Sequence, residues 1–469
     1  MNSQNQPKAL YLLNFVSMWE CFSYYGMRVL LVLFMTQKLL FNDNQAFMLY
    51  ALYTTLIEFG GIAGGVIADK YLGKKWSIYL GGWTIALGHI CMAIPESEMA
   101  FFLGLGLIIS GTCLFRTNVA AFISDFYEKN DSRLDSAYTI YYTGINLGGF
   151  IAAILCGIVG EVYGWHMGFG LASLGMLAGN VTLIVGRKWI QSQQIVNENL
   201  EIIPSIKMVF LGVAGLCALA PICAIALMHA KTAFYWFPAL AIACIFYVYQ
   251  QTKGCTQQEK MGFKKLSIYI IFLALFYAYE EQMGSTLILF AERHLNRETI
   301  FGIFPAASLV TFNPLTILIA GPLVARLFQK YPLSDFTKIQ WGFFLLGSAF
   351  LVLFLCCLVI NSSELIPLEF GSLSIVLISL GEILIGPTVF AAASKYAPEK
   401  LHGLAMGLVT LGFSLANLLS GVLSQMMAIP ENSNSIEIYI NGFGKLSLGA
   451  IVIGLFLSYL QKEKKMVNI

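Results

Sequence analysis

Fourteen apolar stretches dominate this chain and restrict what it can fold into. They begin near residues 11, 46, 76, 99, 137, 164, 206, 232, 264, 301, 336, 369, 402 and 440. Each has the length of about 20 residues that a helix needs to cross the hydrocarbon core of a bilayer. With 58% hydrophobic and only 12% charged residues among 469, the chain has too little polar surface for a soluble globule. We therefore predict an all-α integral membrane protein with fourteen transmembrane helices.

A closed β-barrel is the other structure that spans a bilayer, but its strands alternate apolar and polar residues over about ten positions. The stretches of this chain are continuously apolar, so helices are expected. The connections between them are short and leave no sizeable soluble domain.

Basic residues concentrate in every second connection between the apolar stretches. Clear examples are Lys74 with Lys75, Arg187 with Lys188, and Lys264 with Lys265. Loops rich in lysine and arginine remain in the cytoplasm. This distribution predicts that both termini are cytoplasmic.

The fourteen stretches divide most naturally into six, two and six. The middle pair, roughly 206–228 and 232–250, has no carboxylate or arginine within its apolar runs and is expected to face lipid. We predict an N-terminal six-helix bundle in residues 1–190, an inserted helix pair with its linker in 191–260, and a C-terminal six-helix bundle in 261–469.

Seven ionisable groups lie inside apolar stretches, where a charge costs about 2.5 to 3.5 kcal/mol at the centre of a helix. Five are carboxylates and two are guanidiniums: Glu20, Glu58, Glu280, Glu281 and Glu382, with Arg28 and Arg116. They cannot all be ionised and paired. A buried carboxylate without a cationic partner takes up a proton. The surplus of acids predicts that at least one can be protonated near neutral pH.

Motifs for enzymatic or metal chemistry are lacking in the sequence. The histidines, at 89, 166, 229, 294 and 402, are dispersed, and no cysteine and histidine spacing is typical of a metal site. The loops contain no nucleophile elbow or phosphate-binding loop. A membrane enzyme is therefore disfavoured, and we expect no metal, no cofactor and no nucleic-acid partner.

The run from Gly64 to Lys75 resembles the cytoplasmic loop motif of the major facilitator superfamily. Before and within it, Gly60, Gly61, Gly64 and Gly65 form a small-residue face that allows another helix to approach closely. The resemblance implies a major facilitator fold, in which two six-helix bundles rock around a site near the bilayer midplane.

Further segments resemble the proton-dependent oligopeptide transporter family. They are Glu20 to Arg28, Asp131 to Ala137, Tyr141 to Gly148, Glu281 to Thr286, and Gly381 with Glu382 followed by Pro387 and the run from Ser394 to Pro398. The resemblance implies a secondary transporter that imports di- and tripeptides by alternating access, driven by the proton gradient without a cofactor. Its partners would be short peptides, protons and the lipid of a bacterial-type inner membrane.

The resemblance also implies roles for individual residues. The substrate-binding residues would be Arg28, Arg116, Asn146, Asn313, Glu382, Tyr24, Tyr25 and Tyr142. Glu382 and the two asparagines would bind the amino terminus of the peptide, and the arginines would bind its carboxylate. Arg28 would pair with Glu281 as an outer gate, and Arg116 with Glu382. The alternative for the tyrosines is helix packing, and for the asparagines hydrogen bonding between helices.

The chain departs from the family pattern at residues that the resemblance would assign to proton coupling. Ser17 and Cys21 stand where the first-helix signature has a glutamate and an arginine, and Arg116 stands where a lysine is usual. Arginine does not deprotonate in proteins, so Arg116 cannot itself release a proton. We hypothesise that Glu58 replaces the acid missing at Ser17. The candidate residues for proton coupling and gating are Glu20, Glu58, Glu280 and Glu281.

Two alternatives remain open on the sequence. The degenerate proton motif is compatible with an uncoupled or rewired facilitator for another small zwitterion or anion. A non-transporting membrane receptor built on a transporter fold is the second, although short loops and tails leave little with which to signal.

Overall fold

Long helices make up most of the computed structural model, which describes residues 5–128, 131, 133–191, 203–360, 364–397, 402–430 and 435–462. Within these residues, fourteen helices have at least 19 residues. They are α1 (Lys8–Gln37), α2 (Asp43–Ile67), α3 (Gly73–Met92), α4 (Glu98–Ser124), α5 (Arg133–Tyr163), α6 (Trp165–Val185), α8 (Ile206–Met228), α9 (Ala230–Thr252), α10 (Gln257–Glu280), α12 (Phe312–Lys330), α13 (Asp335–Val359), α14 (Leu368–Tyr396), α15 (His402–Gln425) and α16 (Ser435–Lys462). The predicted all-α class is confirmed.

Membrane-spanning length and composition are found in eleven stretches of the described helices. One of these stretches, Asp43–Met92, contains two of the predicted spans, because α2 continues through the π-helical turn η1 (Ala68–Leu72) into α3. The turn ends at Gly73, whose φ of 72° lies in the left-handed region that favours glycine.

Polar side chains fix where several helices begin. Ser97 and Ser334 accept hydrogen bonds from the backbone N–H groups of the first turns of α4 and α13. Thr256 and Glu259 form a reciprocal capping box at the start of α10. These contacts satisfy N–H groups that have no partner within the helix.

One predicted span begins later in the chain than expected. The span expected near residue 301 begins as the 3-10 helix η4 (Ala307–Thr311) and continues as α12. The preceding residues form a short antiparallel pair, β2 (Glu298–Thr299) with β3 (Gly302–Ile303). Gly302 has a φ of 106°, which closes this turn and is incompatible with a helix. Elsewhere β1 (Leu295–Asn296) pairs in parallel with β4 (Ile366–Pro367).

The chain forms two compact units. Unit 1 contains Met1–Leu31 and Leu56–His229, and unit 2 contains Val32–Thr55 and Ala230–Ile469. The boundaries therefore fall within α1 and α2, and they assign α8 to unit 1 and α9 to unit 2. The predicted division at residues 190 and 260 stays a prediction.

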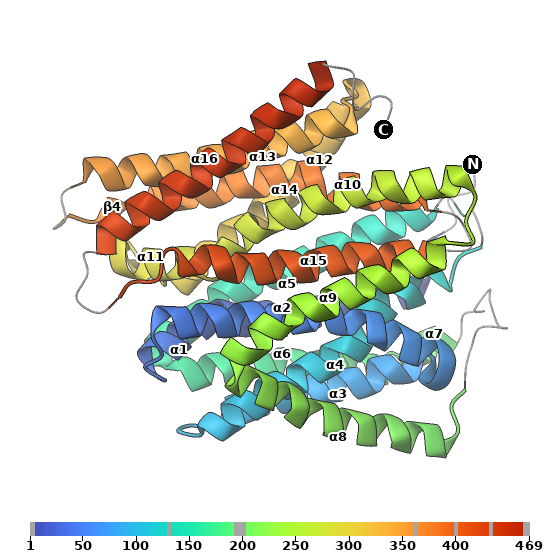
Figure 1. The fold of residues 1–469 in the computed structure, drawn as a ribbon. Helices are drawn as coiled ribbons and strands as arrows, with labels where there is room; N and C mark the ends of the chain where they lie inside the picture. The colour runs from blue at the N-terminus through green and yellow to red at the C-terminus, as the bar shows by residue number, and fades with distance from the viewer. Residues whose placement is uncertain are drawn as a thin grey trace. The chain divides into compact units, whose positions relative to one another are not determined.

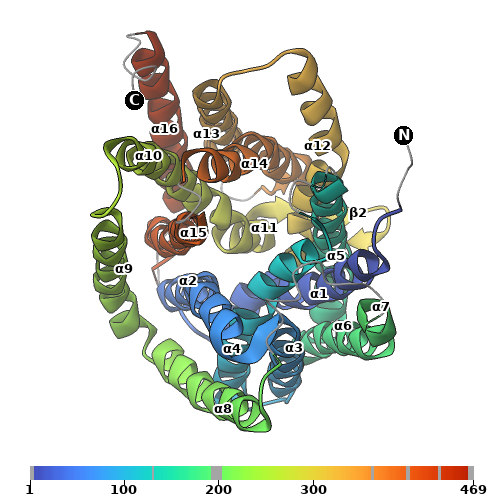
Figure 2. The same cartoon turned by 90° about the vertical axis from the view of Figure 1, so that its right-hand side faces the viewer.

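Each unit is held together by direct helix packing. In unit 1, α3 packs against α4 and α6, and α8 lies along α4 (Figure 1). In unit 2, α13 packs between α14 and α16, and α10 packs against α14 and α15 (Figure 2).

The predicted small-residue face of α2 is confirmed at its crossing with α4. A Cβ atom added at Gly64 would lie 1.7 Å from the carbonyl oxygen of Cys113, so only glycine fits there. The thiol of Cys113 donates to the carbonyl of Gly60 at 2.7 Å, and Asn118 donates to the carbonyl of Gly64 at 3.4 Å. The two backbones are thus in direct contact.

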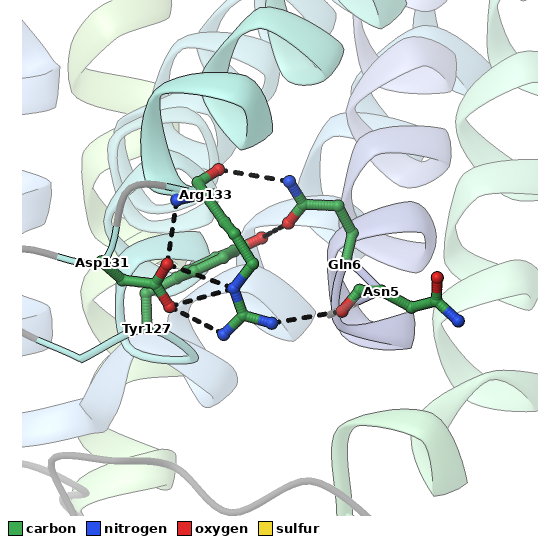
Figure 3. Close-up of polar contacts among 5 residues, drawn as sticks. All are labelled: Asn5, Gln6, Tyr127, Asp131 and Arg133. Atoms are coloured by element: carbon green, nitrogen blue, oxygen red, sulfur yellow. Dashed lines mark hydrogen bonds and ion pairs between the residues drawn. The ribbon is translucent and has the colours of Figure 1, made fainter. Parts of the chain in front are cut away.

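The N-terminal segment is fastened to the connection between α4 and α5, as Figure 3 shows. The guanidinium of Arg133 donates to the backbone oxygen of Asn5 at 3.2 Å, and Gln6 donates to the backbone oxygen of Arg133 at 3.2 Å. Tyr127 donates to the side-chain oxygen of Gln6 at 2.6 Å. Arg133 also donates to both oxygens of Asp131, which lowers the pKa of that carboxyl. We call these five residues the N-terminal clamp.

We expect Gly64→Ala to destabilise the protein by about 1 to 3 kcal/mol, because the added methyl group forces the helices apart at a site already in contact. Gly65→Ala is the matched control, since its Cβ would lie at an ordinary 3.7 Å from Thr117. Thermal unfolding in detergent measures both variants. Equal melting temperatures would contradict the crossing described.

We expect the clamp to open in acid. A carboxyl whose pKa is lower in the folded state stabilises it above the unfolded value of about 3.9, and this contribution is lost as pH falls through the lower folded pKa. Amide hydrogen exchange of residues 5–12, corrected for intrinsic rates, should therefore quicken below about pH 4. Arg133→Gln should show the fast exchange at neutral pH as well; slow exchange in that variant would contradict the clamp.

Candidate functional site

An arginine with two acidic neighbours lies among the helices of unit 1. Nη2 of Arg116 on α4 lies 3.0 Å from Oε1 of Glu20 on α1, and Nη1 lies 3.6 Å from Oε1 of Glu58 on α2. The guanidinium also lies over the ring of Tyr24, 4.4 Å from its centroid. We call Glu20, Tyr24, Glu58 and Arg116 the Arg116 cluster. Three helices contribute to it, as expected for ionisable groups that face the inside of a bundle.

The two carboxylates of this cluster differ in their surroundings. The side chain of Glu20 is 2% exposed, whereas those of Glu58 and Arg116 are 28% and 30% exposed. Glu20 has the shorter contact with Arg116, and the thiol of Cys21 lies 3.5 Å from its second oxygen. Glu20 is therefore the firmly held partner of the arginine, and Glu58 the looser and wetter one.

The remaining predicted residues of α1 lie next to this cluster in the sequence. The guanidinium of Arg28 lies 5.8 Å and 5.9 Å from the ring centroids of Tyr24 and Tyr25. The two rings contact each other edge to face at 5.1 Å. Arg28 and the two tyrosines thus form a small cationic and aromatic group on α1.

On α5, the exposed Tyr142 and the partly buried Asn146 lie one turn apart. The amide of Asn146 donates to the backbone carbonyl of Tyr142 at 2.9 Å. This bond lies within the helix, so it does not join Asn146 to another helix.

A second polar group lies in unit 2. The amide of Asn313 on α12 donates to Oε2 of Glu382 on α14 at 2.8 Å and to the hydroxyl of Ser379 at 3.0 Å. Asn313 and Glu382 are therefore brought together as the predicted roles require, and Asn313 also joins two helices. Ser379 was missed, although its spacing of three residues before Glu382 places both on one helix face.

Glu280 and Glu281 lie at an interruption that the sequence did not reveal. Glu280 is the last residue of α10, and Glu281 begins the 3-10 helix η3 (Glu281–Gly284), which is followed by α11 (Thr286–His294). The next residue, Gln282, is fully buried and was also missed.

The predicted pairs of Arg28 with Glu281 and of Arg116 with Glu382 join residues that belong to different units. Both pairings stay predictions. Within unit 1, the ion pairs of Arg116 are those with Glu20 and Glu58. Across the described residues, no three His, Cys, Asp or Glu side chains are placed to hold a metal ion.

Known proteins of one family are similar to this chain over nearly its whole length. A model of the POT family matches residues 75–442. The chain is 28% identical over 467 residues to "Dipeptide and tripeptide permease A" of Pectobacterium carotovorum subsp. carotovorum (strain PC1), covering 97% of this chain and 91% of that protein.

The solved structures that resemble this chain are also transporters of the POT family. A crystal structure of peptide transporter POT in complex with sulfate superposes with a TM-score of 0.85 at 28% identity, covering 97% of this chain and 95% of the other. A POT family transporter in complex with 5-aminolevulinic acid superposes with a TM-score of 0.84 at 25% identity, covering 97% and 96%.

We expect Arg116→Leu to destabilise the fold by up to about 3 kcal/mol, because it leaves the buried Glu20 carboxylate without its cation. Adding Glu20→Gln should restore part of that loss, since the uncompensated charge is then gone. Melting temperatures of the two single variants and the double variant form the cycle that measures this coupling. Strictly additive changes would show that the pair contributes nothing.

Proposed function

The chain belongs to the POT family of peptide transporters, and on this premise we propose that it couples the uptake of di- and tripeptides to the entry of protons. It is a multi-pass membrane transporter and not an enzyme. The proposal includes both termini in the cytoplasm, and alternating access between bundles 1–190 and 261–469, with the helix pair of 191–260 inserted between them.

The observation that carries proton coupling is the charge of the Arg116 cluster. Two carboxylates share one guanidinium, so the cluster has a surplus negative charge when both acids are ionised. Such a surplus in a partly buried site favours binding of a proton. Arginine does not titrate, so the proton must bind a carboxylate. Glu58, with the longer contact and the greater exposure, is the acid that we assign to proton exchange.

Peptide binding would reinforce protonation at the same place. In the proposal, Arg116 and Arg28 bind the carboxylate of the peptide. A peptide carboxylate adds a second surplus negative charge beside Arg116, which increases the tendency of Glu58 to take up a proton. By linkage, a proton on Glu58 strengthens peptide binding by the same factor. This reciprocity is what a symporter needs.

The other pole of the peptide would bind in the C-terminal half. Glu382, oriented by Asn313, supplies an anionic group for the peptide ammonium, and charge-assisted hydrogen bonds of this type are strong. Asn146, Tyr24, Tyr25 and Tyr142 would contribute hydrogen bonds and ring surface to the peptide backbone. Glu281, with Glu280 beside it, would gate the pathway with Arg28.

The related structure with 5-aminolevulinic acid supports one alternative substrate class. That ligand has an ammonium and a carboxylate, so a site with the same two poles accepts small zwitterions other than peptides. A facilitator for such a molecule, without proton coupling, is the second candidate function.

Uptake of a labelled dipeptide into proteoliposomes tests the proposal. We expect an inward proton gradient to raise the initial rate, a protonophore to abolish this rise, and Glu58→Gln to lose about tenfold or more of it, because an amide cannot exchange a proton. Peptide counterflow without a gradient should persist in Glu58→Gln. Glu369→Gln, an exposed acid, is the matched control.

The results separate three ways in which the proposal can fail. Uptake by the parent protein that ignores both the gradient and the protonophore would overturn symport and favour the facilitator. Full gradient stimulation in Glu58→Gln would leave symport standing but remove Glu58 from it. Absence of any flux, with peptide binding retained, would favour a receptor.

A further inference from the structure

The helix that carries Glu281 is broken in the middle of a long apolar stretch. α10 ends at Glu280, η3 occupies the next four residues, and Ser285 has φ −128° and ψ −89°, outside the helical region, before α11 begins. Irregular backbone at membrane depth is tolerated only where protein groups or the water of a cavity replace the missing hydrogen bonds. The side chains around the break therefore decide its geometry.

Gln282 makes five hydrogen bonds around the break, one of them to a backbone carbonyl of α10. Its amide nitrogen donates to the carbonyl of Ala278 at 3.1 Å, and to the carbonyl and hydroxyl of Ser420 on α15 at 3.1 Å and 3.0 Å. Its amide oxygen accepts from the hydroxyls of Thr286 at 2.8 Å and of Ser424 on α15 at 2.9 Å. One fully buried side chain thus connects α10, α11 and α15.

A second side chain, that of Ser285, holds the backbone of Glu281, the residue before Gln282. The hydroxyl of Ser285 donates to the backbone carbonyl of Glu281 at 3.2 Å and lies 3.1 Å from the hydroxyl of Ser424. The backbone of Glu281 is therefore held from both ends of the break, by the neighbouring Gln282 and by Ser285. Both of these residues are in turn tied to α15.

We propose that Gln282 is a positioning residue for transport, which holds the helix break in one geometry and thereby fixes the place of the Glu281 carboxylate. The inference rests on the proposed function, in which Glu281 gates the pathway. Gln282 suits this task because its amide is neutral and does not titrate, so proton binding by nearby acids leaves its hydrogen bonds intact. An apolar residue of the same size would fill the space but join none of the three helices.

The test compares Gln282→Leu with the parent protein in proteoliposomes. We expect the maximal rate of dipeptide counterflow to fall by about tenfold or more, because small misplacements of a working group have effects of this size. The KM for the peptide should change by less than about threefold, because Gln282 is not assigned to the peptide. The pH dependence of uptake should shift, because the adjacent acid changes its surroundings.

Matched variants separate positioning from stability. Ser447→Ala removes another buried bond between helices of unit 2, at 2.9 Å to the carbonyl of Gly347, far along the chain from the break. It should leave rate, KM and pH profile unchanged. Ser424→Ala, which removes one of the two bonds to the Gln282 oxygen and the contact with Ser285, should change the rate in the same direction by a smaller factor. If Gln282→Leu does not fold, Ser424→Ala provides the test in its place.

An unchanged rate and pH profile in Gln282→Leu, or in Ser424→Ala where that variant must replace it, would overturn the proposal. So would an equal loss of rate in Ser447→Ala. Counterflow needs no proton gradient, so its dependence on Gln282 can be established even where the parent protein fails the test of proton coupling.

Discussion

The ion pairs of Arg116 determine how charge can be accommodated in unit 1. A guanidinium that cannot deprotonate is placed inside a membrane helix, so it needs anionic partners and water in every state of the molecule. Glu20 supplies a close and buried partner, and Glu58 a looser one. Because one cation serves two acids, the charge of the cluster depends on a proton. The same contacts that make the arginine tolerable thus provide the basis for coupling.

The distance between Arg116 and Glu58 depends on an uncharged contact, the close crossing of α2 and α4. Arg116 follows Cys113 by three residues on α4, and Glu58 precedes Gly60 by two on α2. The thiol of Cys113 on Gly60 and its backbone carbonyl against Gly64 fix how closely the two helices approach at this level. A larger residue at Gly64 would move Glu58 away from Arg116. The small-residue face therefore supports the site as well as the fold.

The sequence was sufficient for features that depend on local chemistry. Length and hydropathy located most of the long helices, and the glycines of α2 predicted its close crossing. The partners of Arg116 were not predictable, because spacing along one helix does not say which residue of another helix lies opposite. Glu58 was chosen as a proton site by counting acids, and its contact with Arg116 came only from the packing of α2 and α4. The start of α12 was misplaced because an apolar run does not distinguish a helix from the β2 and β3 turn that precedes it.

The helical pattern is interrupted at η1, between α2 and α3, and at η3, between α10 and α11. The sequence indicates the first interruption but not the second. The π turn η1 is followed by Gly73 and Lys74, and Lys74 pairs with Asp125 at 2.8 Å just beyond the end of α4. Glycine and charges mark such a place, because water can satisfy the backbone there. The break at η3 also has charged residues and a glycine, Glu280, Glu281 and Gly284, but its bonds to α15 come from Ser420 and Ser424, far along the chain. Serine and threonine are also common in unbroken membrane helices, where they bond to their own backbone, so their presence alone does not indicate a break. A break of this kind must therefore be found through the side chain that stabilises it, which here is Gln282.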